Sequence, residues 1–126
     1  MLIPVWDVEY TDQFASWYEA LTEEDQDAII GRVVLLEQDG PGLGRPAVDN
    51  IHQSRHANMK ELRAERSLRV LFAFDPRRKC ILLVGGNKGD TDAASPNWNA
   101  WYARYVPIAD ELYDEHLIEL RNEGTI

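Results

Sequence analysis

The 126-residue sequence lacks features that would direct it to a membrane or out of the cell. It has no apolar run of membrane-spanning length, and its opening residues, MLIPVWDVEY, do not place a basic stretch before an apolar one. Its one cysteine, Cys80, cannot form a disulfide within the chain and fits a reducing compartment. We therefore expect a cytoplasmic protein without a membrane contact, folded as one domain over residues 1–126.

Positive charge is also scarce, with 13 Lys and Arg against 22 Asp and Glu and a net charge of −9. This deficit argues against loose binding to duplex DNA, which depends on neutralising phosphates. The charges are unevenly spread: residues 1–40 hold ten acids and one base, whereas residues 41–96 hold six acids and ten bases. The basic middle segment predicts a local anion site, and phosphate is a common partner for such a cluster.

The N-terminal segment predicts a strand followed by two helices. Residues 4–10 alternate between apolar and polar, which indicates an edge strand. Thr11 and Thr22 can each cap a following helix, and the acids after Thr22 suit the positive end of a helix dipole. The two helices should form an antiparallel hairpin that ends at the breaker sequence beginning with Gly40.

The middle segment predicts strands. Residues 47–58 have an ambiguous pattern, and three strands are then expected near residues 59–64, 68–74 and 79–85. Asp75-Pro76 predicts a type I turn joining the last two strands. The run Cys80–Val84 is apolar on both faces, which indicates a strand covered on both sides with Cys80 as a core residue.

The pattern turns helical again from Asn97, and the helix should be kinked or broken near Pro107 because proline cannot donate to the preceding turn. The resulting order is strand, two helices, three strands and a helix. Strands grouped in this way predict an α+β fold with an antiparallel sheet core. The family resemblance described next implies that this sheet is small and twisted.

Several segments resemble the phage-derived Gp49-like branch of HigB toxins, in the RelE/ParE superfamily of type II toxin–antitoxin systems. They are MKELR at 59–63, LRVLF at 68–72, GNK at 86–88, WY at 101–102 and the helical stretch 107–117. The resemblance implies two N-terminal helices packed on the sheet, and metal-independent cleavage of mRNA on the ribosome. It also implies a helix-turn-helix antitoxin of the HigA type as partner, with operator DNA bound only through that antitoxin.

The resemblance also suggests which residues form the site. Arg69 matches the family's sheet arginine that contacts the scissile phosphate, Arg63 a basic residue on the preceding strand, and Lys88 a basic residue after the last strand. These three are expected to be catalytic, because fixed cations stabilise the negative charge that develops on a phosphate in the transition state. The expected substrate-binding residues are Lys60, Arg66, Tyr102 and His56, the last also as a general base. We expect no metal and no cofactor.

Other interpretations stay open from the residues alone. Arg63 and Arg69 can equally be solvated, or form ion pairs with Glu61 or Asp75, since charged residues are mostly exposed. The basic residues 77–79 are explained by solubility at a hairpin turn. The alternative function is a ParE-like inhibitor of DNA gyrase that does no chemistry, which would not need a dense basic site on the sheet. The acidity of the chain leaves room for a degenerate member that only binds. The acidic terminal segments predict contact with a basic antitoxin.

Overall fold

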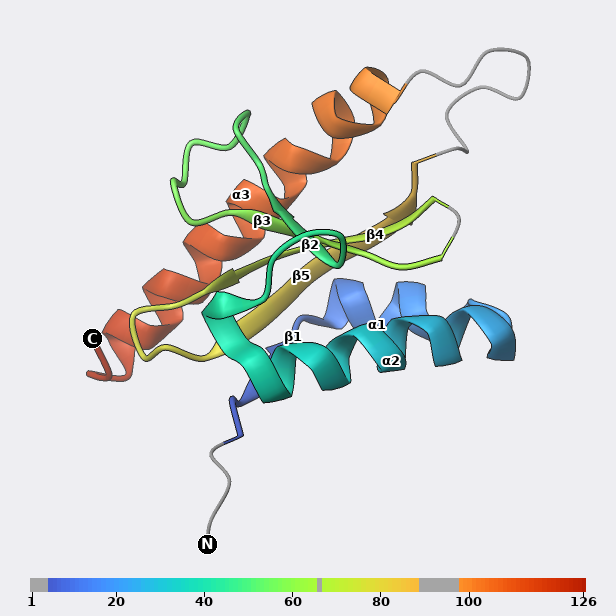
Figure 1. Ribbon diagram of the computed structural model, residues 1–126. Coiled ribbons are helices and arrows are strands. Elements are labelled where there is room, and N and C mark those ends of the chain that lie inside the picture. The colour runs from blue at the N-terminus through green and yellow to red at the C-terminus, as the bar shows by residue number, and fades with distance from the viewer. Residues whose placement is uncertain (1–4, 66, 89–97) are drawn as a thin grey trace, which may run out of the picture.

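The computed structural model describes residues 5–65, 67–88 and 98–126 (Figure 1). Its elements in chain order are β1 (Val8–Tyr10), α1 (Asp12–Glu19), α2 (Glu23–Asp39), a 3-10 turn (Gly40–Gly42), β2 (Val48–Asn50), β3 (Lys60–Arg63), β4 (Leu68–Phe74), β5 (Cys80–Asn87) and α3 (Trp98–Asn122). Within these ranges, no helix combines the length and the apolar character that crossing a bilayer requires.

The five strands form one sheet in the order β1-β5-β4-β3-β2. The pairs β2–β3, β3–β4 and β4–β5 are antiparallel, but β1 runs parallel to β5. The predicted α+β fold is confirmed, and the sheet is mixed because β1 adds in parallel to four antiparallel strands. Alternation in the sequence predicts a strand but not its partner. The ambiguous segment 47–58 contains β2, whose three residues are too few for a period-two pattern to stand out.

Helices cover both faces of the sheet. Figure 1 shows the α1–α2 hairpin on one face and α3 on the other. The core on the hairpin side includes Phe14, Ile29, Leu36, Val70, Phe72 and Leu82. The core on the α3 side includes Leu71, Ile81, Leu83, Trp101, Ala109 and Leu112. The prediction that Cys80–Val84 is covered on both sides is confirmed, and burial raises the pKa of the Cys80 thiol to about 12, which suits a core residue.

The helix ends follow the predicted capping pattern. The Thr11 hydroxyl accepts a hydrogen bond from the Phe14 N–H at 3.0 Å, and the Thr22 hydroxyl accepts one from the Asp25 N–H at 3.2 Å. The predicted break at Pro107 does not occur, since α3 continues through it to Asn122. A proline inside a helix costs about 3 kcal/mol, and α3 offsets this by burying apolar residues on both sides of Pro107 against the sheet.

An extra residue in β5 changes which side chains face α3. Leu71 pairs with Val84 and Phe72 with Leu82, so Leu83 is unmatched in the ladder and forms a bulge. Leu83 and Val84 consequently lie on the same α3-facing side. Beyond the bulge, Gly85 lies against the Trp17 indole of α1, and Gly86 against the Trp101 indole of α3. A Cβ at Gly86 would lie 2.9 Å from Trp101 Nε1, so glycine permits this close approach.

Candidate functional site

Arg63, Arg69 and Lys88 come together on the α3-facing side of the sheet. Arg63 lies directly opposite Arg69, and Arg69 opposite Gly86, in one row across β3, β4 and β5. Residues directly opposite in antiparallel strands direct their side chains to the same face, and Gly86 identifies this face as that of α3. Lys88 follows two residues later on the same side, with its Nζ 5.6 Å from the centre of the Tyr102 ring.

A buried carboxylate organises this row. Glu61 is 2% exposed and lies two residues before Arg63, on the same face of β3. It accepts hydrogen bonds from Arg63 Nε at 2.7 Å and from the Tyr102 hydroxyl at 2.6 Å. Arg63 also contacts Asp49 of β2 at 3.1 Å. The ion pair with Glu61 that the sequence left open is thus formed. We call Glu61, Arg63, Arg69, Lys88 and Tyr102 the site cluster.

Arg69 and Lys88 are held under the first turns of α3 rather than on the open surface. Arg69 is 9% exposed, and its Nη1 donates to the Leu68 carbonyl at 2.8 Å. Lys88 is 8% exposed, and its backbone N–H donates to the Ser67 carbonyl at 2.9 Å. The interpretation of Arg69 as a solvated surface residue is therefore wrong. The hydrogen bond of its guanidinium orients the Arg69 side chain before any ligand arrives.

The environment of the site cluster changes the proton affinities of its members. Burial lowers the pKa of Lys88, the neighbouring charge of Arg69 lowers it further, and Glu61 acts in the opposite direction. Burial and the hydrogen bond to Glu61 raise the pKa of Tyr102 to about 12. Lys88 therefore releases a proton more readily than an exposed lysine, while Tyr102 remains a hydrogen-bond donor at neutral pH.

Two of the expected substrate-binding residues, Lys60 and His56, are not part of this arrangement. Lys60 pairs with Phe72, whose side chain lies in the hairpin-side core, so Lys60 is on the opposite face of the sheet. Lys60 therefore does not join the site cluster, and its role in substrate binding stays a prediction. The sequence did not show this facing, because β3 has too few residues. Arg66 lies outside the described residues.

His56 is also far from the site cluster. Its Nε2 contacts Asp114 of α3 at 2.7 Å. Asp114 is twelve positions after Tyr102 in the same helix, which corresponds to roughly 18 Å along its axis at 1.5 Å per residue. His56 therefore lies outside the site cluster, because the loop after β2 docks on the other half of α3, and its role with the substrate stays a prediction. Within the described residues, no group of three or more His, Cys, Asp or Glu side chains is placed to hold a metal ion.

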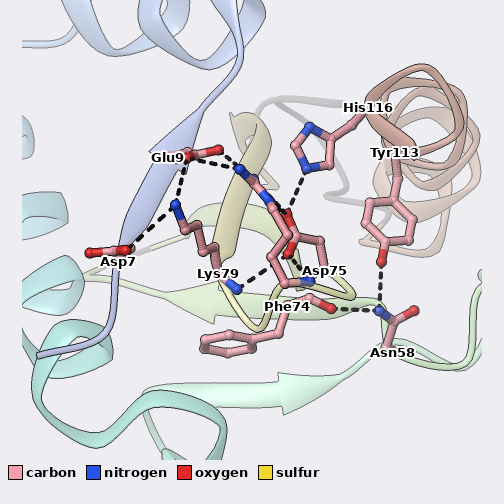
Figure 2. Close-up of polar contacts among 9 residues, drawn as sticks. Asp7, Glu9, Asn58, Phe74, Asp75, Lys79, Tyr113 and His116 are labelled. Atoms are coloured by element: carbon pink, nitrogen blue, oxygen red, sulfur yellow. Dashed lines mark hydrogen bonds and ion pairs between the residues drawn. The ribbon is translucent and has the colours of Figure 1, made fainter. Parts of the chain in front are cut away.

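A second buried charge network lies at the other end of β4 and β5 (Figure 2). The Asp75 carboxylate accepts hydrogen bonds from Arg77 Nη2 at 2.7 Å and from the Arg77 backbone N–H at 2.8 Å, and it contacts His116 Nε2 at 2.8 Å. Arg77 Nη2 also donates to Glu9 of β1 at 2.6 Å. We call Asp75, Arg77, Glu9 and His116 the Asp75 cluster, which joins the hairpin turn, β1 and α3.

The sequence indicated only part of the Asp75 cluster. Asp75 was assigned to a turn, where a carboxylate commonly binds nearby backbone N–H groups, but solubility is the wrong explanation for Arg77. Burial acts to raise the pKa of Asp75, yet the hydrogen bonds from Arg77, His116 and the Lys79 backbone outweigh it and hold this pKa below its ordinary value. No spacing in the sequence shows that His116, 41 residues later, would meet this carboxylate.

Comparisons with known proteins agree with the fold and with the segments singled out above. A Mycobacterium tuberculosis protein named "Putative toxin HigB3" is 47% identical over 113 residues, covering 89% of this chain and 94% of that protein. Another from the same organism, "Putative toxin HigB2", is 37% identical over 115 residues, covering 88% of this chain and 54% of that protein.

Two solved structures share the fold at low sequence identity. The first is the toxin–antitoxin complex RelBE2 from Mycobacterium tuberculosis, with a TM-score of 0.54 and 13% identity, covering 71% of this chain and 98% of that one. The second is the RelE–RelB complex from Pyrococcus horikoshii, with a TM-score of 0.52 and 15% identity, covering 69% of this chain and 99% of that one. The fold is therefore that of RelE. Residues 16–114 match the family of phage-derived Gp49-like proteins, and the chain belongs to that family.

Proposed function

We propose that this protein is the toxin of a type II toxin–antitoxin system and that it cleaves mRNA on the ribosome, in the cytoplasm, until a helix-turn-helix antitoxin of the HigA type neutralises it. The observation that carries the proposal is the row of three cations from β3, β4 and the end of β5, fixed on one face of the sheet. The kinship with the proteins named as HigB toxins and the RelE-like fold support it.

Cleavage through the 2′-hydroxyl makes three demands. The hydroxyl loses a proton and attacks phosphorus, the pentacoordinate phosphorane carries extra negative charge, and the departing 5′-oxygen gains a proton. Arg69 and Arg63 suit the second demand, because a guanidinium can bind two phosphate oxygens at once. Lys88 suits the third, since its lowered pKa makes it a better proton donor than an exposed lysine.

Glu61 and Tyr102 act as positioning residues in this scheme. Glu61 fixes Arg63 Nε, and Tyr102 fixes the second oxygen of Glu61. Tyr102 also lies over Lys88, so it controls how far that ammonium is covered. A phosphate that reaches Arg69 must displace part of this cover, and the Tyr102 ring is then available to stack on a base.

A second candidate function follows from the burial of Arg69 and Lys88 under α3. If α3 stays in place, Arg69 and Lys88 remain almost inaccessible and the site cluster serves only stability. The protein would then act by binding a partner without cleaving RNA, as a degenerate member of the family.

The test is a reconstituted translation reaction with purified ribosomes and one defined mRNA, in which new 5′ ends are mapped after adding the protein. We expect cleavage on translated message and none on the same RNA without ribosomes. Arg69→Gln should lower the cleavage rate by about 10²–10³, the usual cost of removing one preorganised group that stabilises transition-state charge. Arg121→Gln, an exposed arginine in the last turn of α3, is the matched control.

Arg69 is buried, so folding of the variant is checked by circular dichroism at the assay temperature. Arrest of translation without new 5′ ends would select the binding-only function, and a folded Arg69→Gln protein with parental activity would remove Arg69 from the mechanism.

A further inference from the structure

A pocket with a volume of about 350 Å³ lies next to the site cluster, at the end of β5. Its walls include Trp17 of α1, Asp25 of α2, Asn87 of β5, and Trp101, Arg104 and Tyr105 of α3. Two further wall residues, Leu68 and Gly86, connect it to the cations. Gly86 lies directly opposite Arg69, and Leu68 opposite Asn87, at adjacent positions of β4 and β5. We call this cavity the β5-end pocket.

Aromatic rings line the β5-end pocket. Trp17 and Tyr105 are half-buried, so part of each ring is accessible. Tyr105 stacks on Trp101 with ring centres 4.7 Å apart, and Trp101 is itself buried against Gly86, so this pair is fixed on the sheet. Rings held in this way give another flat aromatic group a surface on which to stack, as in proteins that bind single-stranded nucleic acids.

The β5-end pocket also contains one carboxylate and one guanidinium. The Asp25 backbone N–H makes the cap hydrogen bond to Thr22, but the Asp25 carboxylate has no hydrogen bond or ion pair among the described residues. The Arg104 guanidinium lies 5.5 Å from the centre of the Tyr105 ring, and no carboxylate of the described residues pairs with it. Both charges therefore remain available to a ligand.

Guanine complements this pair of charges better than the other bases do. Its Watson–Crick edge places the N1–H and N2–H₂ donors side by side, which suits a carboxylate, and its O6 and N7 are two acceptors that suit a guanidinium. Adenine and cytosine present an acceptor ring nitrogen beside their amino group, so a carboxylate would meet a lone pair. Uracil presents a single N–H donor between two carbonyl oxygens.

We propose that the β5-end pocket binds a guanine base of single-stranded RNA next to the cleaved bond. Asp25 would accept from its N1–H and N2–H₂ groups, and Arg104 would donate to its O6 and N7. An unpaired carboxylate repels RNA, so Asp25 disfavours the wrong base as well as favouring guanine. That the occupant belongs to a cleaved RNA rests on the proposed function, whereas the choice of guanine rests on the charges and rings of the pocket.

An amino-acid side chain from a protein partner fits the β5-end pocket less well. An arginine would pair with Asp25 but would be repelled by Arg104, and an acidic side chain would meet the reverse difficulty. A phenylalanine would leave both charges without a partner, which is costly when a ligand excludes water. Guanine suits both walls because it is uncharged and carries its donors and its acceptors on different edges.

The first experiment measures binding of RNA to the protein without ribosomes. Three hexanucleotides carry guanine, inosine or adenine at one position among uracils, and 2′-O-methyl groups prevent their cleavage. Fluorescence anisotropy gives each Kd, and the indole N–H signals of Trp17 and Trp101 in NMR spectra locate the binding. We expect guanine to bind at least about fivefold more tightly than adenine, the lower end for a bidentate contact that discriminates bases. Inosine, which lacks the N2 amino group, should lie between them.

Variants of the protein then test the two charges. Asp25→Asn should abolish most of the preference for guanine over adenine, because an amide offers one donor and one acceptor, which match adenine. Asp27→Asn is the matched control, since Asp27 is exposed on the same helix and does not line the pocket. Arg104→Gln should weaken binding of the guanine RNA about fivefold, with Arg121→Gln as its control.

Equal affinity for the guanine and adenine RNAs would overturn the proposal, as would a guanine preference that Asp25→Asn leaves intact. Loss of neutralisation by the antitoxin in Asp25→Asn, with RNA preference unchanged, would assign the pocket to a protein partner and would also overturn it. Mapped cleavage of translated mRNA separates this inference from the proposed function. Selective binding of guanine RNA without cleavage counts against the proposed function alone, whereas cleavage with no base preference that depends on Asp25 counts against this inference alone.

Discussion

The site cluster and the Asp75 cluster lie at opposite ends of β4 and β5, and they differ in the balance of charge around a central buried carboxylate. In the Asp75 cluster, donors from the hairpin turn and α3 surround one buried carboxylate. In the site cluster, three cations lie beside one buried carboxylate, Glu61, and Asp49 contacts one of them, Arg63. The first arrangement joins elements of the fold, and the second gathers more cations than carboxylates within the cluster, which supports the phosphate binding proposed above.

The difference has an energetic consequence. Removing the central carboxylate of a buried network leaves the surrounding cations without compensation. Removing one of several neighbouring cations relieves repulsion as well as losing attraction. The Asp75 cluster should therefore respond to substitution mainly through stability, and the site cluster mainly through activity.

The largest effect is expected from Asp75→Ala. It leaves Arg77 and His116 beside an empty, buried position and should lower the free energy of unfolding by about 3–5 kcal/mol. Urea unfolding measures this change. Asp114→Ala is the control, because that carboxylate also contacts an arginine and a histidine but is exposed, and it should change the free energy of unfolding much less. Equal losses in the two variants would contradict the central role of Asp75.

Lys88→Met should separate activity from stability. The substitution removes an ammonium from a buried position beside Arg69, so the free energy of unfolding should change by less than about 1.5 kcal/mol. The cleavage rate should fall by about 10²–10³. Lys79→Met is the control at the other end of β5 and should retain parental activity. A folded, fully active Lys88→Met protein would show that the site cluster, like the Asp75 cluster, has a structural role.

Tyr102→Phe should lower the free energy of unfolding, but by less than Asp75→Ala does. It deletes one hydrogen bond to the buried Glu61, and such bonds to charged groups contribute about 1.5–3 kcal/mol. Ultraviolet titration provides a second measurement, because the phenol that ionises near pH 12 should disappear in this variant. Retention of that step would assign the raised pKa to another tyrosine.

The dependence of the free energy of unfolding on pH should be the smallest of the expected effects. The folded pKa of Asp75 is lower than the unfolded value of about 3.9, so its contribution to stability is present above that value and is lost as pH falls through the folded pKa. Unfolding measured between about pH 6 and pH 2 should therefore show stability falling at the acid end. Asp75→Asn should flatten this part of the curve, and an unchanged slope would assign it to other carboxylates.

The sequence predicted most of the elements because their signals are local. Both threonine caps and the strands around the Asp75-Pro76 turn appear where expected. The parallel pairing of β1 was not predictable, since it joins residues about 72 positions apart. The continuity of α3 through Pro107 also depends on packing that no local pattern contains.

The residues of the site cluster were predicted only in part, because some of the features that place them are not local in the sequence. The resemblance suggested Arg63, Arg69 and Lys88, but the two faces of β3 could not be told apart from four residues, so the facing of Lys60 was not predictable. The bulge at Leu83 lies inside a run that is apolar on both faces, which hides the change of alternation that turns Lys88 toward α3. The sequence indicates Glu61 only as a partner for arginine, and Asp75 as a partner for arginine and a turn residue, although each is the buried centre of its cluster.

The glycine at 86 determines how deep the site cluster lies. Because position 86 has only hydrogen atoms, the Trp101 indole can rest on the strand and bring the next residue, Tyr102, within reach of Glu61. A methyl group there would press against Trp101 and lift the first turns of α3. The accessibility of Arg69 and Lys88 is thus set by the thickness of one side chain, so a single added carbon at this position would act as a spacer between helix and sheet.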